Sequence, residues 1–434
     1  YHQVRKYLLR LDTRKEHGKT WRPSVLLLLN QLNGPLVEFG NHLKKGGLYV
    51  VGNVVLGEHF DRLTGTASRM KKALSDYIYT ENLKAFPAVA VGHSARTAYQ
   101  NLMVMSGLGA MTPNTVVIPY IENLHVEDAN TKKQETKRLP KPSASTLATA
   151  KRSQSEIFFD LSVKMERKEY ETGKFFDTSV TSMDMFVNLV GDARALSKNV
   201  LITRNFYKLV PRHITNSRFI DIWLLDENCV KTWKDFERQA LLILELAHIL
   251  LRNKVWGSQC TVRVLMPVKS SGNALELKIG GELGTVTKKD SKSNYPDVII
   301  EEPESELNTL INGDGEEGTE LTSSCERAKK LLQERVFQAR FEIEELIMIP
   351  VMKEDLLTDS GKSASMAPSK LNRMVRERSS ETLLTLLPLP KLPGKGNGHK
   401  ENDCYYQLLG QLSQDLPPCA LLSESDNRIM SREI

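Results

Sequence analysis

The sequence predicts an α/β fold built from two Rossmann-like lobes with mostly parallel sheets, joined by a disordered linker. Three observations predict it. Short apolar runs alternate with amphipathic helical stretches along most of the chain. A polar, basic segment interrupts this alternation at about residues 126–180. The length of 434 residues also exceeds what one hydrophobic core usually supports, so two lobes are expected.

A short basic helix is predicted at the start of the chain, within residues 1–22. Apolar Val4, Leu8 and Leu11 recur at helical spacing, with basic residues around them. Two interpretations stay open. The segment is either an ordinary amphipathic helix that packs on the lobe behind it, or a membrane-proximal helix that faces anionic lipid headgroups.

The first α/β lobe is expected over residues 23–125. Four strand-like runs alternate there with three helical stretches, and such alternation is typical of parallel strands joined by crossover helices. The strand-like runs cover residues 25–29, 48–56, 85–92 and 115–121, and the helical stretches end near residues 45, 79 and 105.

The linker, residues 126–180, lacks the apolar residues that would offset the cost of ordering it. It carries Pro140 and Pro142, and seven Lys or Arg between Lys132 and Arg152 are opposed only by Glu135. A solvated loop and a segment that binds phosphoinositide or a protein partner both fit this composition.

The second α/β lobe is expected over residues 181–434. Its helices are predicted at 182–196, 232–252, 327–338 and 403–414, and its strands at 199–203, 219–225, 260–268, 341–350, 381–390 and 419–422. Two insertions, at about 270–326 and 354–372, are rich in Ser, Gly, Lys and acidic residues and are expected to be disordered.

No catalytic set, metal site or cofactor site is expected. The five cysteines are scattered without a CxxC pair, and the nine histidines show no ligand spacing. The net charge of +6, from 59 basic and 53 acidic residues, is too mild for a nucleic-acid binder. We therefore expect a protein that is not an enzyme.

The turn at SGLGAMTPN is interpreted as structural. Gly107 and Gly109 start like a dinucleotide-binding fingerprint, but here the glycines follow a helix and precede a strand, which is the reverse of that motif. A helix end with a glycine in the left-handed region, followed by Pro113 and Asn114 before the next strand, is the expected arrangement.

Two serines are candidate phosphorylation sites, because basic residues stand just before them. Ser153 follows Lys151 and Arg152, and Ser379 follows Arg376 and Arg378.

Several strings resemble the cytosolic C-terminal domain of the cation-chloride cotransporters, the solute carrier 12 family. They are VRKYLLRLDTRKEH from Val4, WRPSVLLLL from Trp21, HLKKGGLYVVGNV from His42 and SGLGAMTPNTVVIPY from Ser106, with looser matches at KNVLITRNF, FIDIWLL and SSETLLTLLPLPKLP. Within this family, the sequence is most similar to the branch that contains the cotransporter-interacting protein and the fungal vacuolar potassium-chloride cotransporters.

The resemblance implies a regulatory and dimerisation domain that controls transport by a transmembrane domain upstream in the same chain, since the sequence starts with Tyr1 rather than Met. It implies an electroneutral cotransporter, with potassium and chloride as the expected ions, at the cytoplasmic face of a vacuolar or plasma membrane. The implied partners are that transmembrane domain, a second copy of the chain, regulatory kinases and phosphatases, and the membrane surface through the N-terminal helix. The alternative is a free-standing α/β module, similar to universal stress proteins, that binds a nucleotide or serves as a scaffold.

Overall fold

The computed structural model describes residues 1–11, 21–29, 33–44, 46–122, 124, 182–209, 218–225, 236–269, 277–280, 343, 345–351, 356–357, 365–394 and 398–425. Among these residues, no helix is both long enough and apolar enough to cross a bilayer. The linker prediction for 126–180, the predicted helix 327–338 and the candidate Ser153 lie outside the described residues.

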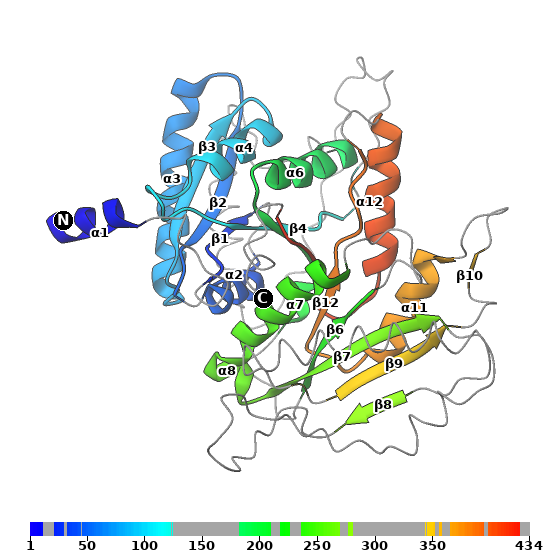
Figure 1. Cartoon of the computed structure of the whole chain (residues 1–434). Helices are drawn as coiled ribbons and strands as arrows, with labels where there is room; N and C mark the ends of the chain where they lie inside the picture. The colour runs from blue at the N-terminus through cyan, green and yellow to red at the C-terminus, as the bar shows by residue number, and fades with distance from the viewer. Residues whose placement is uncertain are drawn as a thin grey trace, which may run out of the picture.

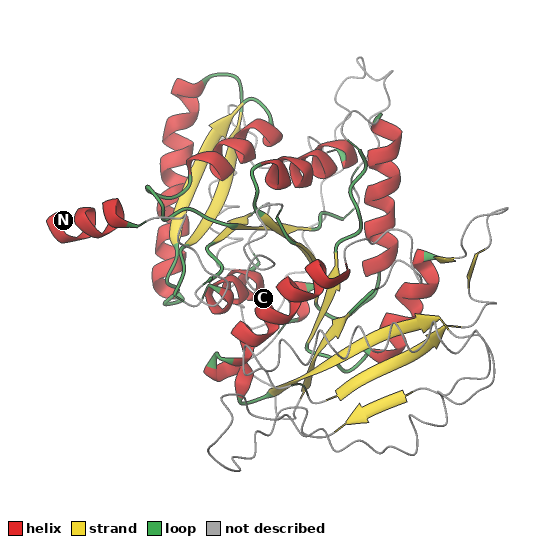
Figure 2. Cartoon of the chain, in the orientation of Figure 1, coloured by secondary structure: helices red, strands yellow, loops and turns green. Residues whose placement is uncertain are grey.

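One sheet of eleven strands runs through the molecule, in the order β3-β2-β1-β4-β5-β13-β12-β6-β7-β9-β8 (Figures 1 and 2). All neighbouring strands are parallel except β5 with β13 and β8 with β9. The predicted α/β class with mostly parallel strands is therefore confirmed. The strands are β1 Val25–Leu28, β2 Tyr49–Leu56, β3 Phe86–Gly92, β4 Thr115–Pro119, β5 Asn199–Arg204, β6 Arg218–Trp223, β7 Cys260–Lys269, β8 Leu277–Gly280, β9 Glu345–Val351, β12 Leu384–Pro388 and β13 Cys419–Ser423.

Helices cover both faces of the sheet. The core on one face contains side chains from α2, α3, α7 and α8, and the core on the other face contains side chains from α4, α6, α11 and α12. The helices are α1 His2–Arg10, α2 Gly34–Leu43, α3 Phe60–Thr80, α4 Ala95–Met105, α6 Met183–Ala195, α7 Phe236–Leu251, α8 Lys254–Gly257, α11 Pro368–Arg378 and α12 His399–Ser413, with a short 3-10 turn at Phe206–Lys208.

The two covered faces explain why β1 is apolar at every position. In β1, Val25 and Leu27 enter one core while Leu26 and Leu28 enter the other, and all four are buried. Successive side chains of a strand point to opposite faces, so a strand between two helix layers needs apolar residues throughout.

The sheet consists of two halves with the same strand order. Toward the centre, the first half reads β3-β2-β1-β4-β5 and the second reads β9-β7-β6-β12-β13, with β8 added outside β9 at the edge of the sheet. The halves meet where β5 and β13 pair antiparallel, with Cys419 opposite Arg204 and Ser423 opposite Val200. Helices in equivalent positions contact each other across this junction, α2 with α7 and α6 with α12. The chain thus has an internal pseudo-two-fold arrangement.

This arrangement differs from the expected division at residue 181. We expected α6 and β5 to begin the second lobe, but β5 pairs in parallel with β4 and completes the first half. The segment between β4 and α6 therefore interrupts the first half instead of joining two lobes. Local patterns locate strands, but they do not show which strands become neighbours.

The predicted insertions are partly ordered. Within 270–326, β8 pairs antiparallel with β9 and ends the sheet on that side. Within 354–372, residues 356–357 (β10) pair with residues 365–366 (β11), and α11 begins at Pro368. In these parts the prediction of disorder is wrong, because short stretches that contain Leu or Ile pair with a neighbouring strand.

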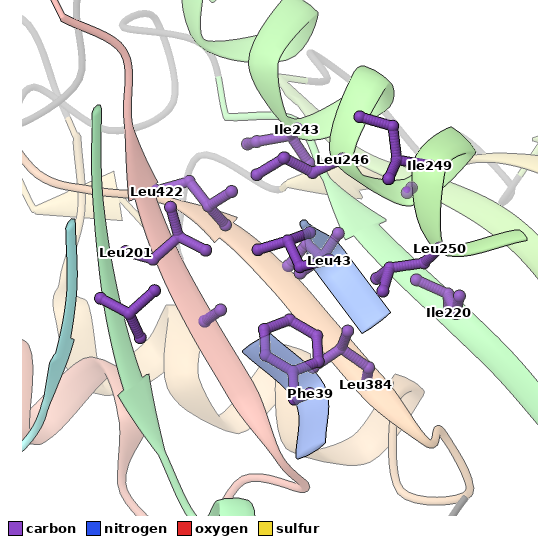
Figure 3. Close-up of a cluster of buried hydrophobic side chains, with 14 of the residues drawn as sticks. Phe39, Leu43, Leu201, Ile220, Ile243, Leu246, Ile249, Leu250, Leu384 and Leu422 are labelled. Atoms are coloured by element: carbon purple, nitrogen blue, oxygen red, sulfur yellow. The ribbon is translucent and has the colours of Figure 1, made fainter. Parts of the chain in front are cut away.

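The centre of the core lies under α2 and α7. Figure 3 shows Phe39 and Leu43 of α2 facing side chains of α7 above the central strands. The ring of Phe39 lies 4.9 Å from that of Phe206 and 6.1 Å from that of Trp256, both edge to face. Trp256 also donates a hydrogen bond to Nδ1 of His42 at 3.0 Å. The two halves therefore share one core on this face.

A buried ion pair fixes the register of β6 on β7. Asp221 is fully buried, and its two oxygens accept hydrogen bonds from Arg263 at 2.9 and 2.8 Å. Thr382 donates a further hydrogen bond to Asp221 at 2.6 Å, and the Arg263 guanidinium stacks on the ring of Phe219 at 3.8 Å. Asp221 and Arg263 are direct neighbours in the parallel register, so a slip by one residue would separate them.

The substitution Asp221→Asn is expected to lower the free energy of unfolding by about 3 kcal/mol, because it leaves the largely buried charge of Arg263 uncompensated. Asp192→Asn is the matched control: it removes a carboxylate paired with Arg96, but the Arg96 side chain is 40% exposed and stays hydrated, so we expect a loss below about 1 kcal/mol. Urea denaturation of both variants measures the difference. Equal losses would contradict a structural role for the buried pair.

Candidate functional site

The turn between α4 and β4 has the backbone geometry that the sequence predicts. Gly107 has a φ of 101° and Gly109 a φ of 60°. Leu108 and Met111 exchange two backbone hydrogen bonds of 3.0 and 3.1 Å, which close the turn. It lies at the amino end of β4, whereas ligands of open parallel sheets bind at the carboxyl ends. The position supports a structural turn, and the absence of a bound cofactor here stays a prediction.

Asn114 ties this turn to its neighbours. Its side-chain oxygen accepts a hydrogen bond from Ser24 N at 2.9 Å, and its side-chain nitrogen donates to the carbonyl of Arg22 at 2.9 Å. Its backbone carbonyl accepts from Asn199 N at 2.8 Å, at the start of β5. The preceding carbonyl, that of Pro113, accepts from Lys198 Nζ at 2.5 Å. The turn thus fixes the entrances of β1, β4 and β5 together.

The candidate Ser379 does not lie on the surface. It is fully buried at the end of α11, and its hydroxyl oxygen accepts a hydrogen bond from the indole of Trp223 at 3.1 Å. A kinase cannot reach this hydroxyl in the folded chain, so the structure argues against Ser379 as a phosphorylation site. The basic residues before it, Arg376 and Arg378, lie in the last turn of α11 and are not a kinase motif.

A group of side chains joins the two halves at the carboxyl ends of β4 and β5, and we call it the seam cluster: Tyr120, Glu122, Arg204 and Tyr406. Arg204 makes two hydrogen bonds to Glu122, of 2.7 and 2.9 Å. Its guanidinium lies 4.6 Å from the ring centre of Tyr120, which stacks on Tyr406 of α12 at 4.9 Å and 15°. Residues from β4, β5 and α12 therefore meet in one contact.

Arg204 also reaches α12 directly. It donates hydrogen bonds to the carbonyl of Gly410 at 2.8 Å and to the hydroxyl of Ser413 at 3.0 Å. A Cβ at Gly410 would stand 2.8 Å from the Tyr120 hydroxyl, so any larger residue there would displace the Tyr120 side chain. This packing holds α12, from the second half, on the last strand of the first half.

Two adjacent tyrosines of α12 bind equivalent positions in the two halves. Tyr406 donates a hydrogen bond to the carbonyl of Ile121, and Tyr405 donates one to the carbonyl of Pro390 at 2.8 Å. Each carbonyl lies two residues after the proline that ends a central strand, Pro119 of β4 or Pro388 of β12. Helix α12 thus donates a hydrogen bond to the equivalent backbone carbonyl in each half.

The tyrosines of the seam stay protonated at neutral pH. Burial, followed by the adjacent Tyr120 hydroxyl, raises the pKa of Tyr406 above its ordinary value, and burial raises the pKa of Tyr405. A protonated hydroxyl is the form that donates to a carbonyl, so these contacts persist over the physiological pH range.

The seam cluster consists of packing and hydrogen-bond contacts that join the two halves. Its side chains are paired with one another and with backbone carbonyls, and no group of three or more potential metal ligands occurs in the described residues. The sequence did not predict the cluster, because its members are separated by up to 286 positions and no spacing pattern links them. The only signal was the position of Tyr120 directly after an apolar strand that ends at Pro119, which by itself indicates nothing about a partner.

Alanine at the two glycines of the turn should have unequal effects. Gly109→Ala is expected to cost about 1 kcal/mol, because the left-handed φ is unfavourable for a residue with a Cβ, although the space is open. Gly107→Ala should cost more, at least about 2 kcal/mol, because its Cβ would collide with the Met111 carbonyl and stand 2.8 Å from Thr112 Cα. Chemical denaturation measures both values.

Gly191→Ala is the control for that pair. Gly191 lies inside α6 with no atom within 4 Å of its would-be Cβ, so alanine should raise stability slightly.

Calorimetry with ATP should show no binding by the parent chain. Tight binding that Gly109→Val abolishes without lowering the melting temperature would show that the turn is a phosphate site.

Stability should fall in alkaline solution. Burial raises the pKa of Tyr49, Tyr99 and Tyr405, so the folded chain holds these protons more tightly than the unfolded chain. Their contribution is complete below pH about 10, the pKa of an exposed tyrosine, and is lost as pH rises toward the folded values. Tyr405→Phe should reduce the slope of stability against pH by about one proton. A variant with the same slope as the parent chain would refute this assignment.

Residues 33–172 match the model of "Solute carrier family 12". The chain is 31% identical over 284 residues to solute carrier family 12 member 9 of Xenopus laevis, covering 63% of this chain and 30% of that protein. It is 29% identical over 289 residues to the vacuolar cation-chloride cotransporter 1 of Saccharomyces cerevisiae, covering 62% of this chain and 24% of that protein.

A solved structure is also similar. It is the crystal structure of the cytoplasmic domain of a prokaryotic cation chloride cotransporter, with a TM-score of 0.41 and 10% identity over 94% of this chain and 99% of that one. The chain spans about a third or less of the length of the relatives named above. The expected resemblance is confirmed by the sequence matches: this chain is similar in sequence to the cation-chloride cotransporters of solute carrier family 12.

Proposed function

We propose that the chain is the cytosolic regulatory and dimerisation domain of an electroneutral potassium-chloride cotransporter, and that it controls transport by a membrane domain of the same protein. The observation that carries this proposal is the sequence similarity to solute carrier family 12, which covers most of the first half of the sheet and extends beyond it. A relative described as a vacuolar cation-chloride cotransporter supports chloride-coupled transport at an internal or surface membrane.

The architecture supports a regulatory role rather than a catalytic one. The two halves form one sheet and meet through the seam cluster, which is built from contacts instead of reactive groups. The relatives are named as carriers, and this agrees with the expectation that the chain is not an enzyme.

The linker begins and ends next to the seam cluster. Tyr120 and Glu122 follow β4, immediately before the linker begins, and α6 starts directly after it ends. The ring of Phe186 in α6 lies 5.9 Å from Tyr120 and 5.4 Å from Tyr406. The residues on both sides of the linker therefore contact the seam cluster. A kinase or partner that acts on the linker, for example at Ser153, would change the forces on that cluster.

Transport by the full-length protein tests this role. Replacing residues 130–176 by a short Gly-Ser segment should leave protein abundance unchanged, because the two anchors already lie together. Chloride-dependent rubidium uptake, which reports potassium transport, should change about fivefold, a typical coupling between linked sites. Ser153→Ala is the matched single-site control for phosphorylation.

The results separate the parts of the proposal. Uptake that is independent of chloride would exclude cation-chloride cotransport. Normal uptake and normal regulation after linker replacement would contradict a regulatory role. Sedimentation of the isolated chain at micromolar concentration should show a dimer, and a monomer at every concentration would argue that this domain does not dimerise on its own.

A further inference from the structure

Four large apolar side chains are exposed together at the end of α4 and in the turn that follows. The exposed fractions of Val104, Met105, Leu108 and Met111 are 60%, 77%, 68% and 44%. Leu108 and Met111 are joined by backbone hydrogen bonds, and Val104 and Met105 end the helix that leads into this turn; we call these four residues the α4-turn patch. Exposed apolar groups gathered in this way mark a surface that another body covers.

Helix α1 presents a second exposed apolar surface. None of its residues is buried, and Val4, Tyr7 and Leu11 are 61%, 66% and 48% exposed. Together with Leu8 they follow the spacing i, i+3, i+4, i+7, which places them on one side of the helix. Arg5, Lys6 and Arg10 lie around the remaining sides. The helix is therefore amphipathic, with an apolar stripe that no core receives.

The two surfaces adjoin. A Cβ on Gly109 would lie 3.8 Å from the carbonyl oxygen of Leu8, so the last turn of α1 passes against the turn after α4. In Figure 1, α1 projects away from the body of the molecule. The apolar stripe of α1 and the α4-turn patch are thus available to the same partner.

The charge of this region has one sign. Residues 1–11 contain Arg5, Lys6 and Arg10 and no carboxylate, and residues 102–114 contain no charged side chain. The side chains that reach the turn from other elements are also cationic or neutral, since Lys198 donates to the Pro113 carbonyl. A protein core or a neutral groove would not require this combination, whereas an anionic lipid surface attracts the cations and accepts the apolar side chains.

We propose that α1 and the α4-turn patch together bind the surface of an anionic bilayer, with Met105 and Leu108 entering the headgroup region beside the apolar stripe of α1. This rests on the membrane location in the proposed function and adds the surface by which the domain lies against that membrane. A helix of nine residues is only about 13 Å long, so α1 alone offers a small contact, and the patch enlarges it. Binding should be reversible and weakened by salt.

Vesicle co-sedimentation of the full 434-residue chain tests the surface. The probes are vesicles of phosphatidylcholine alone and of two parts phosphatidylcholine to one part phosphatidylserine. The parent chain should bind the second kind only, and added salt should release it. The double variant Met105→Ser/Leu108→Ser should lower the partition coefficient between vesicle and water at least about tenfold, because two apolar side chains no longer enter the headgroup region of the bilayer. Arg5→Gln/Lys6→Gln should lower it by a similar factor.

Phe60→Ser is the matched control. Phe60 is 68% exposed, but it starts α3 after the carboxyl end of β2, at the opposite edge of the sheet from the turn. This variant should bind vesicles as the parent does. Circular dichroism and melting temperature check that all variants fold.

Several outcomes would overturn the proposal. Equal binding by the parent and the Met105/Leu108 variant would show that the patch does not touch lipid. Equal binding to both kinds of vesicle would exclude recognition of anionic lipid. A patch variant that loses self-association in sedimentation, with vesicle binding unchanged, would show that a second copy of the chain covers the patch. None of these results depends on transport, so they leave the proposed function to its own test.

Discussion

The antiparallel pairing of β5 with β13 is the contact on which the rest of the architecture depends. Each half of the sheet would otherwise end in an exposed strand edge, and exposed edges recruit other chains. Their pairing removes both edges and produces one continuous sheet. It also sets equivalent helices against each other, so that α2 meets α7 on one face and α6 meets α12 on the other. The shared core and the seam cluster both follow from this one junction.

The sequence predicted the strands and helices well, because a sheet covered on both faces requires apolar strands that stand out from their surroundings. It did not predict the order of the strands. The pairing of β4 with β5 joins segments on either side of a linker of more than fifty residues, and no local pattern encodes that contact. The same reason explains Ser379, where basic neighbours suggested accessibility while burial under Trp223 depends on tertiary packing.

Polar residues inside the apolar strands help to specify the strand register, but the sequence pattern does not show which residues they pair with. Asp221 interrupts the strand FIDIWLL and has no partner in the neighbouring sequence. In the structure its partner is Arg263, one strand away and directly opposite, with Thr382 completing its hydrogen bonds. A charged residue in a buried strand is costly unless it is paired, so it specifies one register out of several that the apolar residues would allow. The turn residues were easier to interpret, because a left-handed glycine and a following proline act locally.

Strand β4 connects the two regions to which this structure assigns roles. It begins directly after the turn that holds Asn114, and it ends directly before Tyr120 of the seam cluster. Five residues of strand span about 17 Å and cannot stretch, and β4 is paired on both sides, to β1 and β5. A displacement of the turn therefore moves the seam with it. In the two proposals, α1 and the turn lie on a membrane and the linker acts on the seam cluster, so β4 would couple the position of the domain on that membrane to the state of its linker.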